Sequence, residues 1–247
     1  MSQMELFEQQ PAASMDTAGF PLPNLAADAA GLFELSADAC CAALYARMSE
    51  LPIQDEIARF IEKVEKAAKA TGGKASGDTA EAARKAAARS ATDRGDPDVL
   101  AVLQAAYKVQ HEIHRLMGLL RFTPDNAGVY TARCAPDHYI LPALAEHFTL
   151  RFGTTPWAII DEKRNLCLYR GKDGETRLKP APDGSLPKVG FQAAGDDAAD
   201  AWEDMWRLYY RSVNNEARKN TRLRQQFMPG RYQKYLNEMD DSGGETK

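Results

Sequence analysis

The sequence predicts an α+β fold that is mostly helical and contains a small sheet of three to four strands, antiparallel or mixed. The strongest observation is a stripe of apolar residues at spacings of three and four between Asp96 and Leu120, which predicts one long helix. Three β-prone runs follow it, at residues 129–133, 156–161 and 166–170. The last two runs are joined by a short polar turn and predict a hairpin, and residues 176–179 are a candidate fourth strand. Because helices and strands do not alternate regularly, we expect a mixed core rather than a parallel α/β fold.

Two shorter helices are predicted before the long one, in a helical N-terminal segment over residues 31–65. Ser36 is suited to cap the first of them, and the second begins after Pro52. Residues 66–95 are rich in Ala, Gly and Lys, with Gly72, Gly73 and Gly77 as helix breakers. We therefore expect a flexible connection there, carrying at most one Ala-rich helix at residues 79–89.

A strand that leads into a helix is predicted at residues 128–152. The β-prone run ends before Pro136, and Asp137 is expected to cap the following helix, with Pro142 in its first turn. His138 and the helix N-terminus would then face outward together. Such an edge commonly holds an anion or a reacting group.

The composition is that of a soluble globular protein, with 247 residues, 44% of them apolar and 27% charged. No apolar run approaches the roughly 18 residues of a membrane span, and the N-terminus lacks a basic region followed by an apolar one. We therefore expect a cytoplasmic protein. The four cysteines show no CxxC spacing, which favours reduced thiols. Residues 1–30 and 240–247 are expected to be disordered tails.

The C-terminal region is strongly basic although the net charge of the chain is −4. Residues 202–235 carry eight basic residues against three acidic ones, and six of the eight are arginines, whose planar fork suits phosphate contacts. Aromatic residues interleave with them and could stack on bases. The region predicts a DNA-binding surface or, alternatively, an Arg-rich solvated helix over an aromatic core, with Trp202, Met205, Trp206, Tyr209 and Val213 on its inner face. The predicted nucleic-acid-binding residues are Arg115, Arg121, Arg207, Arg211, Arg218, Arg222, Arg224 and Arg231.

A second hypothesis is an enzyme that acts on a nucleotide or a damaged base. Imidazole exchanges a proton near neutral pH, so His114 or His138 would be the general acid or base, beside Asp137 or Asp161. The predicted catalytic residues are His114, Asp137 and His138. No Ser-His-Asp, P-loop or Gly-rich dinucleotide pattern indicates a particular reaction, and we expect no cofactor.

One flank of the long helix carries Tyr107, His111, His114 and Gly118. The His pair at this spacing is a possible half of a metal site, but a third ligand is missing from the pattern. We expect a hydrogen-bonding or phosphate-contacting flank, and no metal.

The N-terminal tail suggests a third hypothesis, an interaction protein. Its segment Gln3-Met4-Glu5-Leu6-Phe7 resembles the short motif with which bacterial polymerases and repair proteins bind the sliding clamp. A flexible tail can place a Gln amide and a Leu-Phe pair in a pocket at modest ordering cost. The predicted partner-binding residues are Gln3, Leu6 and Phe7; the alternative is an ordinary apolar patch.

An ordered series of short motifs over residues 95–237 resembles a bacterial family of domains of unknown function. The series comprises His114-Arg115-Leu116-Met117-Gly118-Leu119-Leu120-Arg121-Phe122, Gly128-Val129-Tyr130, Pro136-Asp137-His138 with Leu141-Pro142, Pro156-Trp157, Asp161 with Arg164, Trp202 with Trp206, and Gln226-Phe227-Met228-Pro229 with Arg231-Tyr232. Members of that family are associated with DNA metabolism and DNA repair. They are typically encoded beside a radical S-adenosylmethionine (radical SAM) protein similar to spore photoproduct lyase, or fused to uracil-DNA glycosylase-like domains.

The resemblance implies a family core domain at residues 96–239, a DNA-repair setting and a radical SAM partner, but it implies no reaction. Residues before about 95 do not look like the family's usual start. Within this resemblance, the leading hypothesis is a DNA-binding or accessory protein.

Overall fold

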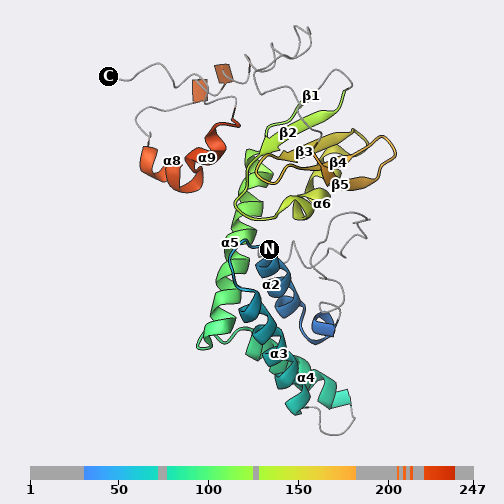
Figure 1. Cartoon of the computed structure of the whole chain (residues 1–247), viewed down its shortest axis with the longest axis vertical. Coiled ribbons are helices and arrows are strands. Elements are labelled where there is room, and N and C mark those ends of the chain that lie inside the picture. The colour runs from blue at the N-terminus through green and yellow to red at the C-terminus, as the bar shows by residue number, and fades with distance from the viewer. Residues whose placement is uncertain are drawn as a thin grey trace.

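The computed structural model describes residues 31–71, 77–124, 128–181 and 220–236, together with 205, 208, 209, 212 and 213. A helical layer lies at one end and a sheet at the other, and the long helix α5 (Pro97–Leu119) runs through both (Figure 1). None of the helices among these residues is long and apolar enough to cross a membrane.

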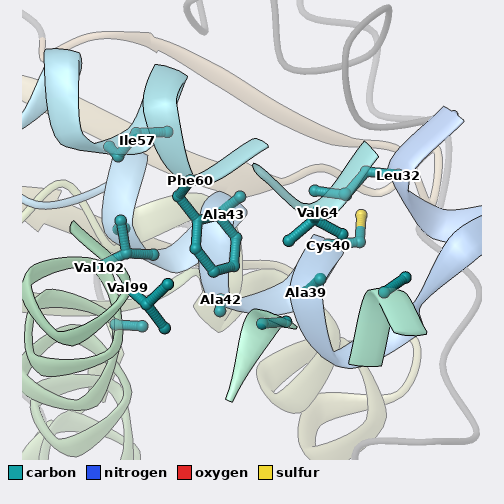
Figure 2. Close-up of a cluster of buried hydrophobic side chains, with 14 of the residues drawn as sticks. Leu32, Ala39, Cys40, Ala42, Ala43, Ile57, Phe60, Val64, Val99 and Val102 are labelled. Carbon is teal, nitrogen blue, oxygen red and sulfur yellow. The ribbon is translucent and has the colours of Figure 1, made fainter. Parts of the chain in front are cut away.

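The helical layer is formed by α2 (Ala37–Arg47), α3 (Gln54–Thr71), α4 (Gly77–Ala91) and the first half of α5. Figure 2 shows Phe60 of α3 beside Ala43 of α2 and facing Val99 and Val102 of α5, and Val64 of α3 beside Cys40 of α2. Apolar side chains at helical spacing thus bury one face of every helix.

Two predicted helix caps are confirmed. Ser36 Oγ accepts the Ala39 N–H at 3.2 Å before α2. Asp96 Oδ1 accepts the N–H groups of Asp98 and Val99 at 2.9 and 3.3 Å before α5. These side chains satisfy backbone donors that have no partner within the helix.

Residues 66–95 differ from the flexible connection that the sequence predicts. Helix α3 continues through Thr71, and the predicted Ala-rich helix is α4, extended to residue 91. Ala68, Ala87 and Ala91 are buried in the helical core. Alanine has the highest helix propensity and packs closely, so a composition that resembles a linker here forms a helical pair.

The sheet has five strands in the order β1-β2-β3-β4-β5, namely β1 (Thr123–Pro124), β2 (Tyr130–Cys134), β3 (Trp157–Asp161), β4 (Leu166–Arg170) and β5 (Thr176–Pro180). Strands β2 and β3 are parallel and all other neighbours are antiparallel. The α+β class, the mixed sheet and the hairpin are therefore confirmed, but the count of three to four strands was too low. The two-residue β1 is too short to produce a period in the sequence.

Helix α6 (Leu141–Phe152) connects the parallel strands β2 and β3. Its Leu144 and Phe148 are buried with Trp157, Ile159 and Leu168 of the sheet. The second half of α5 belongs to the same core. One long helix therefore contributes to both the helical layer and the sheet layer.

The predicted cap of α6 was wrong. The helix begins at Leu141, and Ile140 precedes it without any side-chain cap hydrogen bond. Pro142 does lie in the first turn, as predicted. The Asp137 carboxylate points instead to Arg231, at 2.6 Å.

The C-terminal segment contains α8 (Thr221–Phe227) and α9 (Gly230–Gln233). Every residue of α8 is exposed, whereas Tyr232 and Leu236 are buried. Met205, Tyr209 and Val213, predicted as an inner face, are exposed. The predicted DNA-binding residues Arg207, Arg211 and Arg218 lie outside the described residues, as do Trp202, Trp206, Gln3, Leu6 and Phe7.

Candidate functional site

Two segments meet at the carboxyl ends of the parallel strands β2 and β3. Residues 135–140, here called the hub loop, follow β2, and residues 162–165 form the turn after β3. In sheets with parallel strands, ligands commonly bind outside this edge.

A buried carboxylate, that of Glu112 on α5, holds the hub loop. Glu112 is only 3% exposed. Its two oxygens accept the backbone N–H groups of Asp137 at 2.8 Å and His138 at 2.9 Å. The Tyr232 hydroxyl donates to the same carboxylate. Burial and this hydrogen bond raise the pKa of Tyr232, so the phenol stays protonated as a donor.

Residues 229–236, here called the C-terminal clip, close over the hub loop. Arg231 contacts the Asp137 carboxylate at 2.6 Å, donates to the Tyr232 hydroxyl at 3.1 Å and lies over the Tyr232 ring. Tyr235 donates to Glu162 at 2.6 Å, and Lys234 lies 3.6 Å from the same carboxylate. Arg231, predicted to contact phosphate, is therefore engaged within the chain.

A second buried carboxylate, Asp161, fixes the turn after β3. Its Oδ1 accepts the N–H groups of Lys163 and Arg164 at 2.9 and 3.2 Å, and its Oδ2 lies 2.7 Å from the Arg164 guanidinium. Arg164 then donates to the carbonyls of Pro136 and Asp137, at 3.2 and 2.8 Å. A buried charge is tolerated when it is paired and hydrogen-bonded, and Asp161 meets both conditions.

The segment after α2 is joined to the same loop. Glu50 pairs with both Lys163 and Arg164, and these contacts lower its pKa despite some desolvation. The Tyr139 N–H donates to the Met48 carbonyl at 2.9 Å. Hence the segment after α2, helix α5, the β3–β4 turn and the clip all hold the hub loop, which has the character of a structural junction.

A separate surface, here called the basic face, lies on the exposed side of α5 and on α8. Its residues are Tyr107, Lys108, His111, His114 and Arg115 of α5, Arg121 just after α5, and Arg222, Leu223, Arg224 and Phe227 of α8. The only acidic residue between Val99 and Arg121 is Glu112, which is buried on the other side of the helix. Residues 220–236 contain no acidic residue. This face therefore presents positive charge without an exposed carboxylate of its own.

One hydrogen bond joins the two helices of the basic face. Arg115 of α5 donates to the Gln226 carbonyl of α8 at 3.0 Å. Farther along α5, the rings of Tyr107 and His111 lie 5.6 Å apart. Partial burial lowers the pKa of His111, and the neighbouring Arg115 and His114 lower it further. Tyr107, His111, Arg115 and α8 thus form one continuous surface.

The model of a family described as a domain of unknown function, DUF4130, matches residues 78–238. The chain belongs to this family. No curated protein matches the chain, and no solved structure does. The DUF4130 match contains both the hub loop and the basic face, whereas α2 and α3 precede it. The predicted membership in a family of domains of unknown function is confirmed, and the DNA-repair setting remains a prediction.

The DUF4130 domain brings together only two of the three predicted catalytic residues. Asp137 and His138 are neighbours in the hub loop, while His114 is exposed on α5, about 200° around the helix from Glu112. Burial lowers the pKa of His138, partly offset by Glu112 and Asp137. Arg121 donates to the Gly118 carbonyl at 2.9 Å. Among the described residues, no three His, Cys, Asp or Glu side chains gather as a metal site.

Glu112, Tyr232 and Arg164 were not predicted as organising residues. A signal for Glu112 was present, since it lies on the buried side of α5 with Val109 and Leu116. Tyr232 carries no comparable local pattern.

Proposed function

We propose that this DUF4130 protein is a nucleic-acid-binding accessory module that acts in DNA repair beside a partner enzyme, such as a radical SAM protein. The observation that carries the proposal is the basic face, which combines cations and exposed rings with no exposed acid. Within the described part of the chain, Arg222 and Arg224 are exposed and make no ion pair. Unpaired arginines keep their forks available for phosphate oxygens.

The hub loop supports this proposal indirectly, by fixing the C-terminal segment. The clip is anchored through Arg231, Tyr232 and Tyr235, which places α8 directly before a rigid attachment point. Arg115 adds a contact to α8 itself. Cations on a positioned helix lose less conformational entropy on binding than cations on a free tail.

The enzyme hypothesis has less support. Asp137 is engaged by Arg231 and Glu112 accepts three donors, so neither carboxylate is available as a base. His114 and Arg121 belong to the basic face, away from the hub loop. A phosphate-contacting role suits both residues better than proton transfer.

The double variant R222A/R224A is expected to bind DNA about 10-fold more weakly than the unaltered protein at moderate salt. Loss of two phosphate contacts should also reduce the slope of log K against log salt concentration by about 1.4–1.8. Fluorescence anisotropy with labelled DNA across a salt series measures both quantities.

The matched control is Arg94→Ala. Arg94 is also exposed but lies in the turn between α4 and α5, at the far end of α5 from α8 (Figure 1). The Arg94→Ala variant should leave unchanged both the DNA affinity and the slope of log K against log salt concentration. DNA affinity that is absent, or that does not depend on salt, would rule out phosphate contact by the basic face.

A further inference from the structure

The basic face exposes two aromatic rings that a duplex-binding surface does not need. Tyr107 is 65% exposed and Phe227 is 60% exposed. Phe227 follows Leu223 by four residues, so the two side chains form an apolar ridge on α8. Large apolar side chains left in water beside cations are typical of surfaces that bind a partner.

The two rings lie at opposite ends of the continuous surface described above. Tyr107 contacts His111, and Arg115, eight residues along α5 from Tyr107, donates to Gln226, the residue before Phe227. Eight helical residues span about 12 Å. Stacked nucleotides in a duplex strand rise about 3.4 Å each, so this length suits about three to four bases.

The charges between and beside the rings define the chemistry of the partner. His111, His114 and Arg115 lie along the path, and Arg222 and Arg224 flank the α8 ridge. An apolar peptide would contact only the α8 ridge, and an acidic peptide would contact only the cations. A nucleic-acid strand presents phosphates and flat base faces in turn.

Resting on the proposed function, we propose that the basic face binds single-stranded nucleic acid in preference to duplex. Bases stack on Phe227 and Tyr107, and Arg222 and Arg224 hold the adjoining phosphates. Base faces are accessible to aromatic side chains only when the bases are unpaired, so a duplex offers this surface its phosphates alone. The stacking contacts therefore add affinity for a single strand and none for a duplex.

The test compares an oligothymidylate of about 20 nucleotides with a duplex of equal length, which exceeds a site of roughly 4–16 nucleotides. The full chain should bind the single strand at least about 10-fold more tightly. Phe227→Ala should weaken single-strand binding by about 5- to 100-fold and leave duplex binding unchanged. Phe227→Trp keeps an aromatic ring at this position and should retain single-strand binding.

Phe33→Ala is the matched control, since Phe33 is 62% exposed in the helical N-terminal segment. It should change neither affinity. Thermal unfolding of each variant checks that the fold is intact. Equal or tighter duplex binding, or an equal loss for both probes in Phe227→Ala, overturns the single-strand proposal and leaves the proposed function standing. Failure to bind either probe overturns both.

Discussion

Replacing Glu112 with alanine is expected to lower the free energy of unfolding by about 3–5 kcal/mol. The change removes the acceptor for the N–H groups of Asp137 and His138 and for the Tyr232 hydroxyl. Buried donors without an acceptor retain their full desolvation cost. Urea denaturation followed by tryptophan fluorescence measures the loss.

The same change should release the C-terminal clip. Arg231 and Tyr232 both lose a contact with Glu112, and Tyr232 is otherwise buried. Trypsin should then cleave after Arg231 and Lys234 faster than in the unaltered protein.

Glu112→Gln keeps one acceptor oxygen, so it should lower the free energy of unfolding by less, about 1–3 kcal/mol. Glu175→Ala removes an exposed carboxylate and serves as control. Equal stability of Glu112→Ala and Glu175→Ala would show that the hub loop does not depend on Glu112.

Phe60→Ala is expected to cost about 3–5 kcal/mol, although Phe60 precedes the DUF4130 match. Phe60 of α3 is fully buried where α3 packs against α2 and α5 (Figure 2). Its removal leaves a cavity beside Val99 and Val102, on the same helix that carries the core of the sheet. We therefore expect one cooperative transition, with loss of the whole fold.

Phe33→Ala removes an exposed ring of the same type and should change stability by less than about 0.5 kcal/mol. Circular dichroism reports on the helices, and in a W202F/W206F background tryptophan fluorescence reports on the Trp157 environment. Coincident transitions are expected. A Phe60→Ala variant that loses helix signal first, with Trp157 unchanged, would contradict the coupling through α5.

The regular elements were predictable because their signals are local. The apolar stripe of α5, its Asp96 cap and the β3–β4 hairpin are each produced by neighbouring residues. Asp137 was misassigned because a good capping residue is also a good ion-pair partner, and Arg231, almost a hundred positions away, determines the outcome. Such competition between distant residues has no local signal.

The candidate site was only partly predictable for a related reason. A sequence shows how many arginines a segment carries but not which of them already have partners. Arg231 and Arg164 are engaged by carboxylates, whereas Arg222 and Arg224 project from an exposed helix. The sequence could predict that the C-terminal segment is basic. Only the fold shows which of its arginines belong to the basic face and which are engaged in the clip.

Photo-cross-linking of a single-stranded oligonucleotide that carries 5-iodouracil tests most directly whether the basic face binds nucleic acid. Mass spectrometry of the digested adduct should place the cross-links in residues 107–121 and 220–227, with Tyr107 and Phe227 as the main sites. Excess unlabelled oligonucleotide should suppress them. Cross-links confined to α3 and α4, or spread evenly over exposed aromatic residues including Phe33, would contradict the assignment of nucleic-acid binding to the basic face.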